Sequence, residues 1–201
     1  MCALDLTIKY YNLNARSFFI NTQFVDFENI QAKFLHKLVS GSCLLDFGCG
    51  SGRDTKYFLA QGYTVDAIDG SEEMCKIAAE YTGIPVKQML FHQLDEQEKY
   101  DGIWACASIL HLPLQDLETV LHKMSRALKT SGIIYTSFKY GTFEGERDGR
   151  YFTDMTEETF AVLLKGIPTL TLEEQWISSD VRLGRGDEKW LNLILRKSNI
   201  R

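Results

Sequence analysis

Short apolar runs alternate with amphipathic stretches along most of this chain. One apolar face at helical spacing is formed by Leu114, Leu117, Leu121, Met124 and Leu128, which predicts a helix over 114–128. Similar stretches predict further helices over 26–39, 53–61, 71–81 and 156–165. The apolar runs between them predict strands over 42–47, 63–68, 84–89, 101–106, 132–138, 170–177 and 189–196.

This order of elements predicts an α/β fold with a doubly wound, seven-stranded sheet. A helix follows each of the first strands, so we expect mostly parallel pairing with right-handed crossovers. No helix separates the last two strands, so we expect a hairpin in which the final strand is antiparallel. No repeat or linker divides the sequence, which predicts one domain over 1–201.

The first predicted strand of the sheet ends in a glycine-rich turn. Asp46 precedes Gly48, Gly50 and Gly52, and a helix is predicted to begin at Arg53. Glycines let the backbone turn sharply and approach a ligand, and the helix start directs free N–H groups at it. A dinucleotide fingerprint needs a glycine where Arg53 stands, and the Asp46 carboxylate repels pyrophosphate but attracts an ammonium group. The spacing therefore favours S-adenosylmethionine (SAM) as the ligand.

A second acid lies at the end of the next predicted strand. Asp69 follows Gly48 by about twenty residues, the offset at which a carboxylate meets ribose hydroxyls in nucleotide-binding folds. Each motif alone is weak evidence for a cofactor. Together they predict a nucleoside-containing ligand at the carboxyl ends of the strands.

On these motifs the chain resembles the class I SAM-dependent methyltransferase superfamily, over about residues 10–197. The resemblance implies the Rossmann-like methyltransferase fold and methyl transfer from SAM. Many members place an acid after the third strand to contact adenine, whereas residues 88–91 here read Gln-Met-Leu-Phe, so backbone groups would read the base instead. The cofactor contacts implied are Asp46, Gly48, Cys49, Gly50, Arg53, Asp69, Gly70, Met74, Phe91 and Cys106.

The N-terminal segment holds adjacent tyrosines and resembles the part that folds over SAM in small methyltransferases. This implies a helical lid over 1–40 on an α/β core over 41–201. Tyr11 is expected against the sulfonium cation and Tyr10 against the methyl acceptor. The alternative is that both rings belong to the core of an amphipathic helix. Arg53 likewise either contacts the cofactor carboxylate or is a solvated residue of the first helical turn.

Two segments after later strands carry the candidate acceptor chemistry. His111 follows the fourth strand, at the place where family members hold the transferred methyl, and is a candidate proton acceptor. The alternative is a histidine that packs at a helix start.

The other candidates are arginines in the long loop over 138–152 and in the turn over 179–187, which open at the same edge of the sheet. A guanidinium can bind two oxygens of a carboxylate or phosphate. The alternative is that neighbouring acids pair with these arginines and fix the two loops. The candidate residues are Arg147, Arg150, Arg182 and Arg185.

Composition narrows the class of protein. The chain has 201 residues and a net charge of −5, which disfavours nonspecific binding to nucleic acid. Its apolar runs are too short to span a membrane, and its start does not resemble a secretory signal, so we expect a soluble cytoplasmic protein, monomeric or homodimeric. The cysteines are odd in number and lack C-x-x-C spacing, so neither a disulfide framework nor a metal site is predicted. They are Cys2, Cys43, Cys49, Cys75 and Cys106.

The resulting hypothesis is a SAM-dependent methyltransferase that acts on a small anionic metabolite. Few side chains in the predicted cleft are suited to act as bases, which favours an acceptor that is already anionic or carries an acidic hydroxyl or thiol. Two alternatives stay open at this point: a tRNA or other nucleic-acid methyltransferase that uses these arginines and Lys139 as a phosphate track, and a non-catalytic SAM-binding partner subunit.

Overall fold

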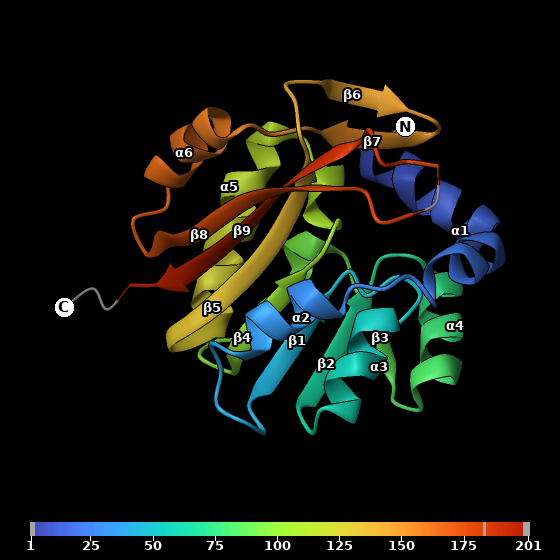
Figure 1. Ribbon diagram of the computed structural model, residues 1–201, viewed down its shortest axis with the longest axis horizontal. Helices are drawn as coiled ribbons and strands as arrows, with labels where there is room; N and C mark the ends of the chain where they lie inside the picture. Colours follow the sequence, from blue (N-terminus) through green and yellow to red (C-terminus); the bar gives the residue numbers. More distant parts are fainter. Residues whose placement is uncertain (1–2, 183, 199–201) are drawn as a thin grey trace.

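The computed structural model describes residues 3–182 and 184–198, so Cys2 of the cysteine prediction lies outside the described residues. A seven-stranded sheet has the order β3-β2-β1-β4-β5-β9-β8, and it crosses the centre of the molecule (Figure 1). Its strands are β1 (Cys43–Phe47), β2 (Thr64–Asp69), β3 (Val86–Gln88), β4 (Tyr100–Ala105), β5 (Leu128–Lys139), β8 (Leu170–Ser179) and β9 (Lys189–Lys197).

The pairing confirms the predicted doubly wound topology. β1 lies between β2 and β4 and pairs with both in parallel, so the strand order reverses at β1. β9 pairs antiparallel with both β5 and β8, as expected for a final strand that follows β8 in a hairpin. The carboxyl ends of β1, β2 and β4 therefore meet at one edge, where ligands bind in open α/β sheets.

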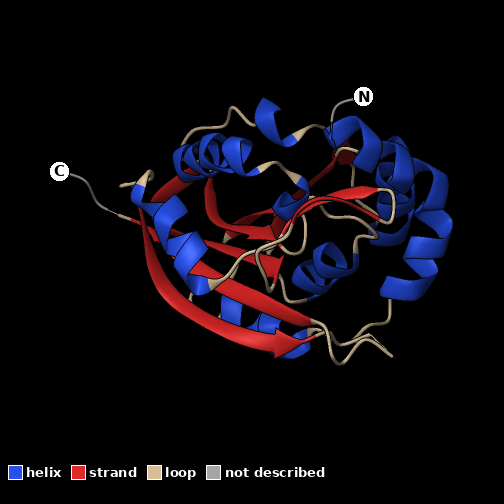
Figure 2. Ribbon diagram, turned by 90° about the horizontal axis from the view of Figure 1, so that it is seen from above, coloured by secondary structure: helices blue, strands red, loops and turns tan. Residues whose placement is uncertain are grey.

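Helices cover both faces of this sheet (Figure 2). Buried side chains of α2 and α3 join a core cluster with Trp104 and Tyr135 on one face. Buried side chains of α5 and α6 join the larger cluster on the other face. The helices of the core are α2 (Glu28–Leu35), α3 (Arg53–Ala60), α4 (Glu72–Thr82), α5 (Leu114–Ala127) and α6 (Glu157–Lys165).

The predicted helix over 26–39 is longer than α2. Beyond Leu35 the backbone N–H groups of Lys37 and Leu38 bond to carbonyls three residues back, at 3.2 and 3.0 Å. This tightening ends the regular helix.

Two elements that the apolar pattern did not predict close over the carboxyl edge. The long loop after β5 folds as a hairpin of β6 (Glu144–Arg147) and β7 (Arg150–Thr153). The N-terminal segment is one helix, α1 (Ala3–Thr22), which packs against α4, β7 and the 3₁₀ helix η2 (Ile109–His111) (Figure 1). The Tyr151 backbone N–H donates to Thr7 Oγ1 at 3.0 Å and links hairpin to helix.

No helix within residues 3–182 or 184–198 has the length and apolarity needed to cross a membrane.

Candidate functional site

A cavity of about 630 Å³ opens at the carboxyl edge of the sheet. This volume lies within the range of about 300 to 1,000 Å³ that is typical of small-molecule sites. One end is formed by the glycine turn and the start of α4, and the other by the β6–β7 hairpin and the β8–β9 turn. α1 supplies Thr7, Ile8, Tyr11 and Phe18 to the wall between the two ends.

The glycine turn is a tight backbone arc that excludes side chains. Gly48 has a φ of +86°, and a Cβ built on it would lie 2.5 Å from the Cβ of Ser108. The N–H groups of Gly48 and Cys49 both donate to the Ile68 carbonyl, at 3.0 and 2.9 Å. The backbone of β1 is thus held against β2, and the cavity beside the turn stays open to a ligand.

Asp69 connects this turn to the next helix. Its carboxylate accepts the Gly50 N–H at 2.9 Å through one oxygen and the Ser71 N–H at 2.8 Å through the other. Burial raises the pKa of Asp69, and these backbone N–H bonds oppose the rise. Each carboxylate oxygen has a second lone pair, so Asp69 keeps acceptor capacity toward the cavity that it lines.

Asp46 lies behind the turn rather than in the cavity lining. It is 2% exposed, and it accepts a hydrogen bond from Thr55 Oγ1 at 2.5 Å. Burial raises the pKa of Asp46 well above the carboxyl range, and the nearby charge of Asp54 adds to the rise. Asp46 is therefore placed to stabilise the turn from below, not to contact an ammonium group directly.

Asp54 also lines the cavity at this end. It accepts bonds from Arg53 Nε and Nη2, both at 2.8 Å, in a bidentate pair. Gln31 Nε2 at 2.6 Å and Trp104 Nε1 at 2.8 Å complete the network. Burial acts to raise the pKa of Asp54, but Arg53 together with the hydrogen bonds from Trp104 and Gln31 outweighs it, and the net shift is downward. The Arg53 guanidinium stays fixed in the lining, with Nη1 outside these bonds.

His111 lies at the acceptor end, on η2, and is 5% exposed. Its Nδ1 is 2.6 Å from the Tyr151 carbonyl oxygen, and its Nε2 is 3.0 Å from the Tyr11 hydroxyl. Burial lowers the pKa of His111 to about 4, and the charge of Arg150 adds to the lowering. The ring is therefore neutral at physiological pH and is held between α1 and the hairpin.

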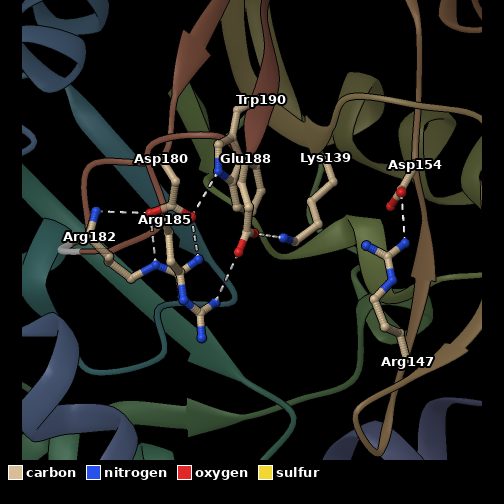
Figure 3. A network of polar contacts seen from close by, with 8 residues as sticks. All are labelled: Lys139, Arg147, Asp154, Asp180, Arg182, Arg185, Glu188 and Trp190. Atoms are coloured by element: carbon tan, nitrogen blue, oxygen red, sulfur yellow. Dashed lines mark hydrogen bonds and ion pairs between the residues drawn. The ribbon is translucent and has the colours of Figure 1, made fainter.

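Most arginines of the acceptor end are paired with acids (Figure 3). Arg147, at the turn end of β6, bonds Asp154, which directly follows β7, at 2.7 Å. Arg182 forms a bidentate pair with Asp180 in the β8–β9 turn, and Trp190 Nε1 also donates to that carboxylate, at 3.1 Å. In the same turn, Glu188 pairs with both Arg185 and Lys139. These contacts fit the alternative in which the acids fix the two loops.

Arg150 differs from the other three. No carboxylate within 3–182 and 184–198 forms an ion pair with it, and its buried Nε has no hydrogen-bond partner there. The guanidinium carbon lies 4.5 Å from the ring centre of Tyr10 and 5.1 Å from that of Phe152. A cation held between aromatic rings and short of acceptors is suited to bind an anion.

The remaining predicted residues divide between the lining and the layer behind it. Gly70, Cys49, Phe91 and Cys106 line the cavity, as do all four candidate arginines. Met74 and Tyr10 do not line it. Met74, a residue of α4, is fully buried, and the Tyr10 ring packs against the Arg150 guanidinium. Neither side chain therefore lies where it would contact a ligand in the cavity directly.

Residues 44–132, about two fifths of the chain, match the family model described as "Methyltransferase domain". The rat N-terminal Xaa-Pro-Lys N-methyltransferase 1 is 33% identical over 121 residues, which cover 53% of this chain and 54% of that protein. An uncharacterized methyltransferase of Anoxybacillus flavithermus is 29% identical over 140 residues, covering 65% of this chain and 66% of that protein. The chain spans about half the length of the first curated relatives it matches.

Residues 44–132 therefore carry a methyltransferase domain, and the chain is similar to class I SAM-dependent methyltransferases. Solved structures agree with the fold of this superfamily. The 1,6-didemethyltoxoflavin-N1-methyltransferase of Burkholderia thailandensis, solved with S-adenosylhomocysteine, has a TM-score of 0.76 at 22% identity, covering 95% of this chain and 85% of that one. The SAM-bound magnesium protoporphyrin IX methyltransferase of Synechocystis has a TM-score of 0.75 at 16% identity and covers 98% of both chains.

The methyltransferase cofactor fits the residues at the glycine-turn end. The Gly48 position has no room for a side chain, Asp69 has spare acceptor capacity for ribose hydroxyls, and Arg53 presents a fixed cation for a carboxylate. Phe91 and Leu90 supply an apolar wall for a base. When bound, SAM supplies an electrophilic methyl group on a sulfonium.

Sequence reasoning missed the network around Asp54. Gln31 and Trp104 are separated from Asp54 by 23 and 50 residues, so no local sequence pattern predicts their contacts with it. A polar residue on the apolar face of the α2 helix was an available signal, because Gln31 lies among the positions that face the core and is 2% exposed.

Proposed function

We propose that this protein transfers a methyl group from SAM to a small metabolite that carries a carboxylate or similar anionic group. Methyl transfer from a sulfonium needs no acid for the leaving group, so alignment of acceptor and methyl is the main catalytic task. In this proposal the glycine turn binds the cofactor at one end of the cavity, and the acceptor end binds the second substrate at the other.

The supporting observation is the Arg150 guanidinium, which faces the cavity without an acidic partner in the described part of the chain. The other cations at this end have partners already, so Arg150 is the available one. A bound anion would satisfy it through two parallel N–H bonds.

The paired state of the remaining cations also argues against a nucleic-acid substrate. A phosphate track needs free lysines and arginines that displace counterions, whereas Lys139, Arg147, Arg182 and Arg185 are engaged with acids. A peptide that begins Xaa-Pro-Lys, the substrate named for the rat relative, presents two positive groups. The unpaired charge of Arg150 at this end would repel them.

The test is a screen of fractionated metabolites with SAM and the purified protein, read by mass spectrometry as a gain of one CH₂ unit. We expect the methylated product to derive from an anionic compound, and Arg150→Met to lose its formation while still binding S-adenosylhomocysteine by calorimetry. Parallel reactions contain an Xaa-Pro-Lys peptide and total tRNA. Methylation of either of these, with no anionic product, would overturn the proposal.

A further inference from the structure

The hydrogen bonds of His111 fix which ring nitrogen carries the proton. A carbonyl oxygen only accepts, so the 2.6 Å contact with Tyr151 requires the hydrogen on Nδ1. In the neutral ring Nε2 then has a lone pair, and it accepts the bond from the Tyr11 hydroxyl at 3.0 Å. The basic nitrogen of His111 thus points toward the hydroxyl of a cavity-lining residue.

Packing leaves the imidazole a single orientation. The Phe152 ring lies edge-on to it with centroids 4.8 Å apart, and the Tyr11 ring does the same at 5.6 Å. These contacts come from β7 and α1. A ring that only filled space would not need both nitrogens engaged at hydrogen-bond distance.

Arg150 is the charged group that acts on both residues of this pair. It acts electrostatically on His111 and on Tyr11, and it contacts the Tyr11 hydroxyl as well. Asp69, Arg182 and Tyr10 also act electrostatically on Tyr11, and no carboxylate of the described residues bonds to the imidazole. As long as Arg150 is not neutralised, its charge opposes protonation of His111.

We propose that Tyr11 and His111 form a proton-accepting pair, and that the methyl acceptor presents its nucleophile to them as a neutral N–H or O–H group while its anionic group lies on Arg150. This inference rests on the proposed function. The acceptor lone pair forms the new bond to the methyl carbon as the carbon–sulfur bond breaks, which leaves a neutral thioether. The acceptor proton passes to Tyr11 Oη as the Tyr11 proton moves to His111 Nε2.

The acceptor anion makes this transfer possible. Once a carboxylate lies on Arg150, the opposing charge is compensated, and an imidazolium can form beside it. An anionic acceptor therefore raises the basicity of the group that deprotonates it. A neutral analogue of equal size would leave His111 a poor base.

The first test measures the titration of His111 by NMR in ¹⁵N-labelled protein saturated with S-adenosylhomocysteine. His111→Gln assigns the signal among the four histidines of the chain. Benzoate serves as the anionic probe. We expect it to raise the midpoint of His111 by about one pH unit or more in the wild type, and not in Arg150→Met. Binding of benzoate that leaves the midpoint unchanged overturns this inference but not the proposed function. Absence of benzoate binding overturns both.

A matched pair of variants tests the hydrogen bond itself. Tyr11→Phe removes the donor to Nε2, so its ¹⁵N signal should move toward that of an unbonded ring nitrogen. Tyr10→Phe keeps that donor and should retain the wild-type signal. Equal spectra for both variants would contradict the pair.

The product of the metabolite screen gives an independent test. We expect the new methyl group on a nitrogen or oxygen that carried a proton in the acceptor. A product methylated on its carboxylate, or on an atom without a proton, would overturn the inference and leave the proposed function standing.

Discussion

The two ends of the cavity are built from different parts of the chain. At the cofactor end the backbone provides the geometry, through Gly48 and the N–H groups bonded to Asp69. At the acceptor end side chains from distant elements provide it, through Tyr11, His111 and Arg150. A backbone turn is encoded by neighbouring residues, whereas a side-chain cluster depends on how α1 and the hairpin dock.

The largest effect that separates the ends is expected at the glycine turn. Gly48→Ala adds a Cβ at 2.5 Å from that of Ser108 and at a φ of +86°, so we expect a loss of about 2 to 5 kcal/mol in unfolding free energy. Binding of S-adenosylhomocysteine should also weaken, by about tenfold or more. Urea unfolding and calorimetry measure the two effects.

The matched control for this change is Gly62→Ala. Gly62 has a similar φ of +83° with no atom within 4 Å of the added Cβ, so it should lose only about 1 to 2 kcal/mol and keep ligand affinity. Equal losses for the two variants would show that the contact with Ser108 is not what requires Gly48.

The same difference explains how much the sequence could predict. The spacing of Asp46, three glycines and Asp69 predicted the strand, the turn and the helix, because each depends on residues nearby in the chain. Helical periodicity predicted α5 from 114 to within one residue of its end at Ala127. The parallel order followed from the alternation of elements and the rule for crossovers.

The acceptor end could be predicted only as a set of candidates. Sequence places Arg147 and Arg150 in one loop and treats them alike, but the β6–β7 register sets them opposite each other and only Arg147 reaches Asp154. The bond between Tyr11 and His111 joins residues 100 positions apart. Such pairings are decided by tertiary packing, which local patterns do not encode.

A pH-dependent difference at the acceptor end is expected next in size. Because burial lowers the pKa of His111 to about 4, the unfolded chain binds a proton below about pH 6.5 that the folded protein does not. The contribution of neutral His111 to the unfolding free energy is therefore fully present above pH 6.5. It is lost as the pH falls to 4, and the loss reaches about 3 kcal/mol. His111→Asn should lack that component of the pH dependence in urea unfolding.

His122→Asn is the control, because it leaves His111 in place and changes a half-exposed histidine of α5. This variant should lose as much unfolding free energy between pH 6.5 and 4 as the wild type does. A His111→Asn protein with an unchanged slope would argue that the folded protein takes up the proton on His111.

Substitution of the two facing arginines of the hairpin should then affect different properties: stability for Arg147 and anion binding for Arg150. Arg147→Met strands the Asp154 carboxylate, whose side chain is 8% exposed, so we expect a loss of about 1 to 3 kcal/mol in unfolding free energy. Arg150→Met strands no acid, so its stability should stay within about 1 kcal/mol of the wild type while benzoate binding disappears. Urea unfolding and a benzoate titration followed by NMR give both quantities.

The outcome that would contradict this contrast is a reversal. If Arg150→Met unfolds more easily than Arg147→Met and both bind benzoate equally, Arg150 is a structural residue of the hairpin. Arg150 would then not be the cation that binds the anionic group of the acceptor.

The smallest expected difference lies within the β8–β9 turn. Arg182 holds Asp180 through two side-chain bonds, and Asp180 also accepts from Trp190, so Arg182→Ala should cost about 1 kcal/mol. Arg185 meets Glu188 at 3.8 Å with almost half of its side chain exposed, so Arg185→Ala should cost less than about 0.5 kcal/mol. Urea unfolding at about 0.05 M and 1 M salt separates them, because screening weakens the exposed pair more than the buried one. A larger loss for Arg185→Ala would mean that its ion pair, rather than that of Arg182, holds the turn over the cavity.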